Sequence, residues 1–260
     1  MKKRFDFTKT MIKEAGAFLL SHKSERVNIT AKSVNDYVTE ADKKCENLIV
    51  SEIKKAFPQD GFYCEESGTV DSASGFTWVI DPIDGTVNYM NTFPLYTISI
   101  ALKKDDEIVM GCVYVPEYDE LFSALKGSGA YLNGERINQS SFTDMKKSLA
   151  ILVPPHRMHD ELPYYMTRYE KILKAVSDIR GLGSAAISLC YVACGRCSIY
   201  YELGLHLYDF AAGAIILQEA GGKIKISPRE GEMYDITSSC SQFFEKLLEL
   251  TKWLKLSYLT

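Results

Sequence analysis

The pattern of hydrophobic and polar positions divides the chain into two parts with different predicted structure. Residues 5–22 carry apolar side chains at the spacing of one helix face: Phe7, Met11, Ala15, Phe18 and Leu19. A second helix is predicted from about Asp36 to Phe57, because Pro58 and Gly61 would end it there.

Short runs rich in β-branched and aromatic residues follow the second helix. Clusters of Asp, Gly, Lys and Pro separate these runs, which predicts adjacent strands in a largely antiparallel sheet. The predicted strands are Phe76–Ile80, Tyr96–Leu102, Ile108–Val115 and Glu120–Ala124.

The second part alternates strand-like and helix-like segments, a pattern typical of α/β proteins. The predicted strands are Leu149–Val153, Cys197–Glu202 and Lys223–Ile226, and the predicted helices are Leu162–Val176, Ser184–Cys194 and Asp209–Ala220. A final amphipathic helix and a frayed tail are expected between Lys246 and Tyr258. We therefore expect an α/β protein with an α+β N-terminal half, residues 1–145, and an α/β C-terminal half, residues 146–260, packed as one compact body.

Composition and charge exclude several classes of protein. The 260 residues are 46% hydrophobic and 25% charged, which is ordinary for a globular protein and unlike a disordered or collagen-like chain. The formal net charge of −4 argues against a dedicated nucleic-acid binder, which needs a concentrated basic face. No apolar run approaches the ~20 residues that cross a membrane, and charges interrupt the N-terminal segment where a signal peptide would need an apolar core. We expect a cytoplasmic protein without membrane contact, whose seven scattered cysteines are reduced thiols.

The most informative segment is Trp78–Tyr89, in which an apolar strand runs directly into two carboxylates. Asp81 and Asp84 leave the sheet at one place, and Gly85 and Thr86 could begin a helix whose free N–H groups attract phosphate. Carboxylates and anion-binding amides can lie side by side when a hard divalent cation sits between them. Mg²⁺ is the usual cation where phosphate is also bound, so the segment indicates a magnesium and phosphate site.

Each acidic position also has an ordinary structural interpretation. Asp81 and Asp84 could be turn residues, and the Glu65–Glu66 pair could be a solvated turn. Asp209 could serve only as a helix cap. The small residues of Ala211–Gly213 that follow it demand close packing, which is unusual for a surface helix.

Together these motifs resemble those of the inositol monophosphatase family. The resemblance covers about residues 5–250, with the motifs in the family's order and spacing: Glu65-Glu66-Ser67, Asp81-Pro82-Ile83-Asp84-Gly85-Thr86, Asp209-x-Ala211-Ala212-Gly213 and Glu219-Ala220-Gly221-Gly222. It implies a lithium-sensitive, Mg²⁺-dependent phosphomonoesterase with a layered αβαβα sandwich of the sugar-phosphatase type, usually a homodimer.

The resemblance also implies ligands for two to three Mg²⁺ ions. The first ion would be held by Glu65, Asp81 and the Ile83 carbonyl, and the second by Asp81, Asp84 and Asp209. A third, looser ion would also use Glu65. Lys32 resembles a loop lysine near the metals, although its spacing to Asp42 is one residue shorter than in the family pattern.

Catalytic and substrate-binding residues carry over in the same way. Thr86 would orient the attacking water, with Asp42 as its partner carboxylate, while two cations lower the pKa of that water. Glu202 would accept hydroxyls of the polyol. The expected substrate-binding set is Asp84, Gly85, Thr86, Gly183, Ser184, Ala185, Glu202 and Asp209.

Several functions stay open from the sequence. Inositol 1-phosphate is the leading substrate, and the alternatives within the family are fructose 1,6-bisphosphate, NADP(H), histidinol phosphate and 3′-phosphoadenosine 5′-phosphate. A non-catalytic RNA-associated regulator is the alternative from another class, and the intact set of acidic motifs argues against it. The Cys194-x-x-Cys197 pair lacks a second pair of ligands, so we do not interpret it as a zinc or redox site.

Overall fold

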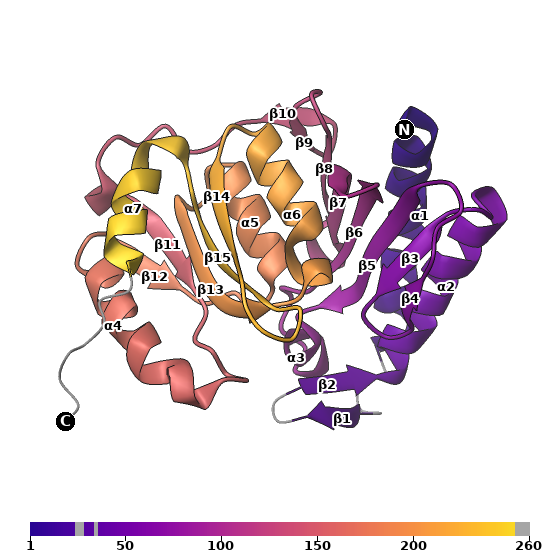
Figure 1. Ribbon diagram of the computed structural model, residues 1–260, viewed down its shortest axis with the longest axis horizontal. Coiled ribbons are helices and arrows are strands. Elements are labelled where there is room, and N and C mark those ends of the chain that lie inside the picture. Colours follow the sequence, from indigo (N-terminus) through magenta and orange to yellow (C-terminus); the bar gives the residue numbers. More distant parts are fainter. Residues whose placement is uncertain (24–28, 34–35, 253–260) are drawn as a thin grey trace.

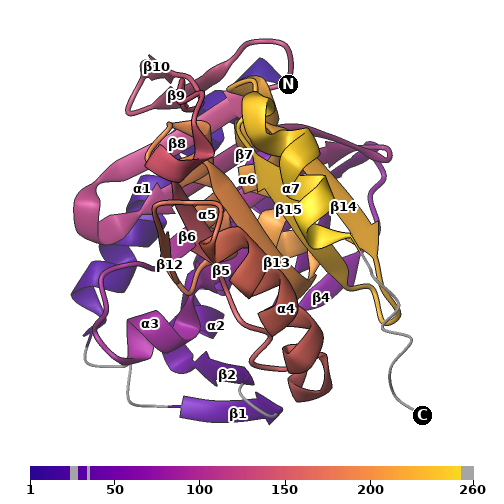
Figure 2. The same cartoon turned by 90° about the vertical axis from the view of Figure 1, so that its left-hand side faces the viewer.

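The computed structural model describes residues 1–23, 29–33 and 36–252, which are arranged as alternating layers of helices and sheets (Figure 1). Helices α1 and α2 cover the outer face of an eight-stranded sheet, and α5 and α6 lie between this sheet and a five-stranded one. Helices α4 and α7 cover the outer face of the second sheet, which is turned toward the viewer in Figure 2. The order of layers is therefore the expected αβαβα sandwich.

The helices are α1 (Lys2–Ser21), α2 (Glu40–Ala56), α3 (Thr86–Met90), α4 (Leu162–Leu173), α5 (Ala185–Ala193), α6 (Leu207–Glu219) and α7 (Phe244–Thr251). The first ten strands are β1 (Ile29–Ser33), β2 (Asp36–Thr39), β3 (Gly61–Cys64), β4 (Gly68–Val70), β5 (Phe76–Asp84), β6 (Thr97–Lys104), β7 (Glu107–Val115), β8 (Glu120–Leu125), β9 (Ala130–Leu132) and β10 (Glu135–Ile137). The remaining strands are β11 (Leu149–Leu152), β12 (Asp178–Arg180), β13 (Ile199–Leu205), β14 (Lys223–Pro228) and β15 (Tyr234–Ser239).

The eight-stranded sheet has the order β10-β9-β8-β7-β6-β5-β3-β4 and is antiparallel except where β3 pairs with β5. The five-stranded sheet, β12-β11-β13-β15-β14, is parallel on one side of β13 and antiparallel on the other. The prediction of a largely antiparallel first sheet is confirmed. The second sheet also contains the strands at Asp178–Arg180 and Tyr234–Ser239, which the sequence analysis did not predict.

Three hydrophobic clusters fill the spaces between the layers. The first packs α1 and α2 on the eight-stranded sheet around the buried Trp78 and Ile12. The second lies between the two sheets. It includes Phe122 and Tyr200 from the two sheets, and Leu189 and Phe210 from the helices α5 and α6 between them. The third lies beneath α4 and α7. Because α5 and α6 are buried on both sides, their many Ala and Gly positions allow the close approach that the sequence indicated.

The predicted helix Asp36–Phe57 is wrong at its beginning. Asp36–Thr39 forms β2, which pairs with β1, and the helix begins at Glu40. Thr39 and Asp42 make a capping box, in which the Asp42 N–H donates to the Thr39 hydroxyl and the Thr39 N–H donates to the Asp42 carboxylate. This reciprocal cap satisfies the first free amides of α2, so the helix starts there and not four residues earlier.

The other boundaries agree with the predictions to within a few residues, except that β5 continues four residues beyond Ile80 and reaches Asp84. Lys32 belongs to β1, but its side chain lies outside the described part of the structure, as do Trp253, Lys255 and Tyr258 of the expected tail. Across the described residues, no helix is long and apolar enough to cross a membrane.

Candidate active site

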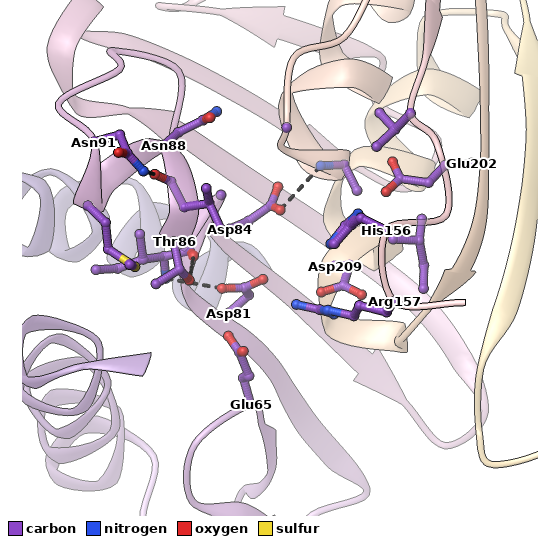
Figure 3. Close-up of a pocket in the computed structure, with 18 residues that line it drawn as sticks. Glu65, Asp81, Asp84, Thr86, Asn88, Asn91, His156, Arg157, Glu202 and Asp209 are labelled. Carbon is purple, nitrogen blue, oxygen red and sulfur yellow. Dashed lines mark hydrogen bonds between the residues drawn. The ribbon is translucent and has the colours of Figure 1, made fainter. Parts of the chain in front are cut away.

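A cavity of about 630 Å³ opens where the ends of both sheets meet (Figure 3). Ten of the residues expected in the site line it: Glu65, Asp81, Ile83, Asp84, Gly85, Thr86, Gly183, Ala185, Glu202 and Asp209. They come from separate segments of the chain, on β5, α3, α5, β13, α6 and the turn after β3. The fold therefore gathers the acidic motifs in one place.

A β-bulge sets the geometry of the two aspartates of β5. In a regular strand, residues three apart point to opposite faces of the sheet. Asp81 lies opposite Ser99 of β6 and Asp84 opposite Thr97, so one extra residue is inserted between them. This insertion reverses the alternation and lets Asp81 and Asp84 face the same cavity.

Asp84 is held by the beginning of α5, which belongs to the second half of the chain. The Ser184 hydroxyl and the Ala186 N–H donate to Oδ2 at 2.5 and 2.7 Å, and the Ala185 N–H donates to Oδ1 at 3.2 Å. Burial raises the pKa of Asp84 to about 6, although these three donors oppose the rise. Ser184, which the resemblance places among the substrate-binding residues, is buried, and its hydroxyl contacts Asp84.

Asp209 caps a helix and also faces the cavity. It is the third residue of α6, and its Oδ2 accepts the His206 N–H at 2.6 Å. Burial raises its pKa well above the usual value, and the charges of Asp84 and Glu65 raise it further. The carboxylate of Asp209 therefore caps α6, as the structural interpretation expected, and it also faces the cavity.

Asp81 is the most buried of the cavity carboxylates, with 2% of its surface exposed. Its Oδ1 accepts the N–H of Ile83 at 3.0 Å, inside the bulge. Burial raises the pKa of Asp81 well above the usual value, and the charges of Glu65, Asp84 and Asp209 add to the rise. Four carboxylates thus repel one another across one cavity.

Thr86 lies at the start of α3, directly after Gly85. Gly85 has φ 95°, and an added Cβ would lie 3.0 Å from the Gly183 carbonyl, so this turn requires glycine. The Thr86 hydroxyl lies 3.3 Å from Asp42 Oδ1 and 3.1 Å from the Ile83 carbonyl, and its single proton can go to either. Asp42 is fully buried behind Thr86 and reaches the cavity only through it; burial raises its pKa to about 7.

Glu202 lies at the opposite side of the cavity from Glu65 (Figure 3). Its Oε2 accepts the hydroxyl of the fully buried Tyr200 at 2.5 Å. Burial raises the pKa of Glu202 to about 8, the Tyr200 hydrogen bond opposes that rise, and Asp84 adds to it. This carboxyl is therefore largely neutral at pH 7 in the absence of a ligand.

Further residues line the cavity that the sequence analysis did not select, among them His156, Arg157 and Asn88. His156 and Arg157 follow β11, and the charge of Arg157 lowers the pKa values of Glu202 and Asp209. The Asn88 amide donates to the carbonyls of Leu95 and Leu182, so it ties α3 to the segment before α5. The signal for His156 and Arg157 was their place directly after a predicted strand, as for Asp81.

The donor set fits hard divalent cations, because it consists of carboxylate and carbonyl oxygens without a thiolate or imidazole among the expected ligands. Buried carboxylates that raise one another's pKa values are stabilised by a cation placed between them. Within the described residues, no three His, Cys, Asp or Glu side chains already form a group that would hold a metal ion.

Comparison with known proteins gives a consistent result. A family model described as the inositol monophosphatase family matches residues 1–243. An inositol-1-monophosphatase of Mesorhizobium japonicum is 35% identical over 81% of this chain and 80% of its own, and a Nus factor SuhB of Pasteurella multocida is 38% identical over 75% and 73%. The crystal structure of the suhB protein of Bartonella henselae superposes with a TM-score of 0.90, at 32% identity, over 95% of this chain and 97% of that one. The chain therefore belongs to the inositol monophosphatase family, whose members are metal-dependent phosphatases of small phosphorylated substrates.

Proposed function

We propose that this protein is a Mg²⁺-dependent phosphatase that hydrolyses a phosphate monoester of a small polyol, with inositol 1-phosphate as the first candidate. The observation that carries the proposal is the convergence of Glu65, Asp81, Asp84 and Asp209 on one cavity, beside the amides of Gly85 and Thr86. A cavity of about 630 Å³ is within the usual range for a small-molecule site.

The metal ligands follow from this convergence. We assign one Mg²⁺ to Glu65, Asp81 and the Ile83 carbonyl, and a second to Asp81, Asp84 and Asp209, with a third, looser ion near Glu65. When bound, these ions supply the charge that polarises the phosphate, lowers the pKa of a water and stabilises the leaving oxygen.

The chain's own groups position the reactants. The first amides of α3, at Gly85 and Thr86, have no partner within the helix and are available to phosphate oxygens. If the Thr86 hydroxyl donates its proton to ionised Asp42, its lone pairs stay available to accept a hydrogen bond from the attacking water and so orient it. Asp42 acts here as a positioning residue, because it reaches the water only through Thr86. No covalent nucleophile is required, since phosphoryl transfer depends on positioning and charge neutralisation.

Glu202 is our candidate for recognition of the alcohol part of the substrate. Its side chain is 7% exposed, lines the cavity and keeps one oxygen free of the Tyr200 hydrogen bond. Gly183 and Ala185 line the same part of the wall and leave room for a ring.

A phosphate-release screen tests the proposal. The purified protein is incubated with and without Mg²⁺ over a panel of inositol 1-phosphate, fructose 1,6-bisphosphate, NADP(H), histidinol phosphate and 3′-phosphoadenosine 5′-phosphate. We expect Mg²⁺-dependent release, fastest from inositol 1-phosphate. Faster phosphate release from another compound of the panel would assign that compound as the substrate in place of inositol 1-phosphate. Absence of release from every member would contradict a phosphatase function.

A second candidate is a regulatory role, which the names of relatives such as the Pasteurella multocida Nus factor SuhB raise. The complete acidic set argues for catalysis in this chain, because a protein that only binds a partner does not need it. The screen separates the two, since a regulator without catalysis releases no phosphate. Lithium inhibition and a homodimer, which family membership implies, are further proposals that inhibition assays and light scattering would check.

A further inference from the structure

A carboxylate that the mechanism does not use lies directly beneath the acidic turn of the site. Glu46 of α2 is 2% exposed, and its two oxygens accept the N–H groups of Glu66 at 2.9 Å and Ser67 at 2.8 Å. The N–H of Glu65 donates to the Ile80 carbonyl at 3.1 Å. Three consecutive amides of the turn are therefore held, two of them by a single side chain.

Besides the pairing of β3 with β4 that closes it, this turn has little packing around it. The turn of residues 65–67 joins β3 to β4, which is the edge strand of its sheet and is exposed at all three of its residues. Packing therefore does little to fix its position. Charge-assisted hydrogen bonds to a buried carboxylate are stronger than neutral ones and have a defined geometry.

The same face of α2 supports a second part of the site. Asp42 and Glu46 are four residues apart, so their side chains lie on one face of the helix. Asp42 contacts Thr86, and Glu46 holds the turn that carries Glu65. Cys45, beside them on the helix, lies 3.8 Å from the Pro82 carbonyl in the bulge of β5. One rigid helix thus contacts the three segments that carry the water-orienting residue and the expected ligands of the first metal.

We propose that Glu46 is a positioning residue, which sets the distance of Glu65 from Asp81 and so the affinity of the site for its divalent cation. The proposal rests on the metal-dependent function proposed above. The carboxylate of Glu46 adds negative charge beside an acidic turn, so it repels Glu65. A cation bound to Glu65 would offset this repulsion. Partners that orient metal ligands are typically worth about 10- to 100-fold in metal affinity.

The chain contains a matched control for this interaction. Glu219 at the end of α6 also accepts two backbone N–H groups with its two oxygens, from Gly127 and Gly129, both at 2.8 Å. It fixes the turn between β8 and β9, and none of these three residues lines the cavity. Glu219→Gln therefore disturbs the same kind of contact at a place without a metal ligand.

The experiment measures Mg²⁺ binding directly by titration calorimetry, together with the melting temperature with and without Mg²⁺. We expect Glu46→Gln to raise the dissociation constant for Mg²⁺ by about tenfold or more, and Glu219→Gln to change it by less than about twofold. Both variants should lose some thermal stability without metal. If Glu46→Gln does not fold, Glu46→Met is measured in its place, because it removes the buried charge with a side chain of similar length.

A double variant separates positioning from a general loss of structure. In a Glu65→Gln background, Glu46→Gln should weaken Mg²⁺ binding little further, because its effect passes through Glu65, while its effect on melting without metal should persist. Fully additive effects, or equal weakening by Glu219→Gln, would overturn the role of Glu46. Failure of the wild-type protein to bind Mg²⁺ would instead count against the proposed function itself.

Discussion

The acidic residues of this site lie where the fold excludes most water, and three of them accept backbone N–H groups. Asp84 is held by the first amides of α5, Asp209 by an amide that precedes α6, and Asp81 by the Ile83 amide within the bulge. These amides fix the orientation of the carboxylates but do not neutralise them, because the pKa values of all three remain raised. The proposed cation would supply the positive charge that these amides do not provide.

The metal assignment predicts the effect of Asp209→Asn. Asparagine keeps the size of the side chain and an oxygen that can accept the His206 N–H, but it removes one negative ligand. Losing a cation that stabilises the leaving oxygen costs several kcal/mol of barrier, so kcat should fall more than about a thousandfold with the fold intact. Steady-state kinetics at saturating Mg²⁺, with circular dichroism as the control, measure this. Near-normal turnover would contradict the ligand assignment.

The specificity of the site should depend on Glu202 and on pH. The pKa of Glu202 is raised to about 8, so ionised carboxylate becomes the main form only above that pH. A hydrogen bond from a polyol hydroxyl to an ionised acceptor is worth about 1.5–3 kcal/mol, against about 0.5–1.5 kcal/mol for a bond to a neutral one. Glu202→Gln should therefore reduce kcat/KM for inositol 1-phosphate modestly at pH 7 and by about tenfold or more at pH 9.

A substrate without those hydroxyls provides the control for Glu202. With p-nitrophenyl phosphate, the same substitution should change kcat/KM much less, because the expected metal ligands and Thr86 are untouched. The ratio of kcat/KM between the two substrates, compared between wild type and variant at both pH values, is the measured quantity. A ratio that does not change would show that Glu202 does not contact the polyol.

At the scale of secondary-structure elements, a buried ion pair fastens α1 to the first sheet. Arg4 donates through Nε and Nη2 to both oxygens of Asp60, each at 2.7 Å, and its guanidinium stacks between Phe57 and Phe76. Asp60 also accepts from Ser74 at 2.6 Å and from the indole of Trp78 at 2.9 Å. One carboxylate therefore joins α1, the loop after α2 and β5.

This arrangement predicts how stability depends on pH. Burial alone would raise the pKa of Asp60, but the hydrogen bonds to its carboxylate outweigh it and the pKa lies below the usual value. A carboxyl group whose pKa is lower in the folded protein than in the unfolded chain stabilises the fold. This stabilisation is complete above the pKa of the unfolded chain, about 3.9, and is lost as the pH falls through the pKa of the folded protein. Asp60→Asn should cost about 2–3 kcal/mol at neutral pH, because it weakens hydrogen bonds to a charged group.

Urea unfolding of wild type and Asp60→Asn between about pH 5 and pH 2 checks this prediction. The difference in unfolding free energy should be constant down to about pH 4 and shrink below it. A matched surface substitution, Asp6→Asn, alters an exposed ion pair with Lys9 and should change stability by less than about 1 kcal/mol. A difference that stays constant to the lowest pH would mean that the pKa of Asp60 is not depressed.

The longer helices and the strands β5 to β8, β11, β13 and β14 could be predicted from the sequence because their apolar periodicity is strong. Other strands, among them β9, β10, β12 and β15, were not predicted. The start of α2 could not be placed by periodicity, since the capping box of Thr39 and Asp42 decides it by hydrogen bonding. The bulge in β5 is likewise invisible to an apolar pattern, because Asp81 and Asp84 stand three apart whether or not the strand is regular. Both features depend on hydrogen bonds that form only in the folded chain.

At the scale of the whole molecule, the site lies between the two sheets and neither half contains it. The acidic motifs could be named from the sequence, but their partners could not, because Ser184 is 100 residues from Asp84 and the Leu182 carbonyl is 94 from Asn88. His156 and Arg157 enter the cavity only because β11 ends beside it. Periodicity describes each segment separately, whereas the tertiary fold determines which segments meet.

The shared core predicts that the two halves do not fold separately. Helices α5 and α6 pack against both sheets, so residues 1–145 alone would expose the sheet face that carries Val79, Val113 and Phe122. Without the second half this surface meets water, and burial of apolar surface is the main favourable term in folding. We expect fragment 1–145 to aggregate or to lack a cooperative unfolding transition, and the full chain to unfold in one transition. Circular dichroism and tryptophan fluorescence during urea titration measure both transitions. A fragment that unfolds cooperatively on its own would show that residues 1–145 are an independent domain.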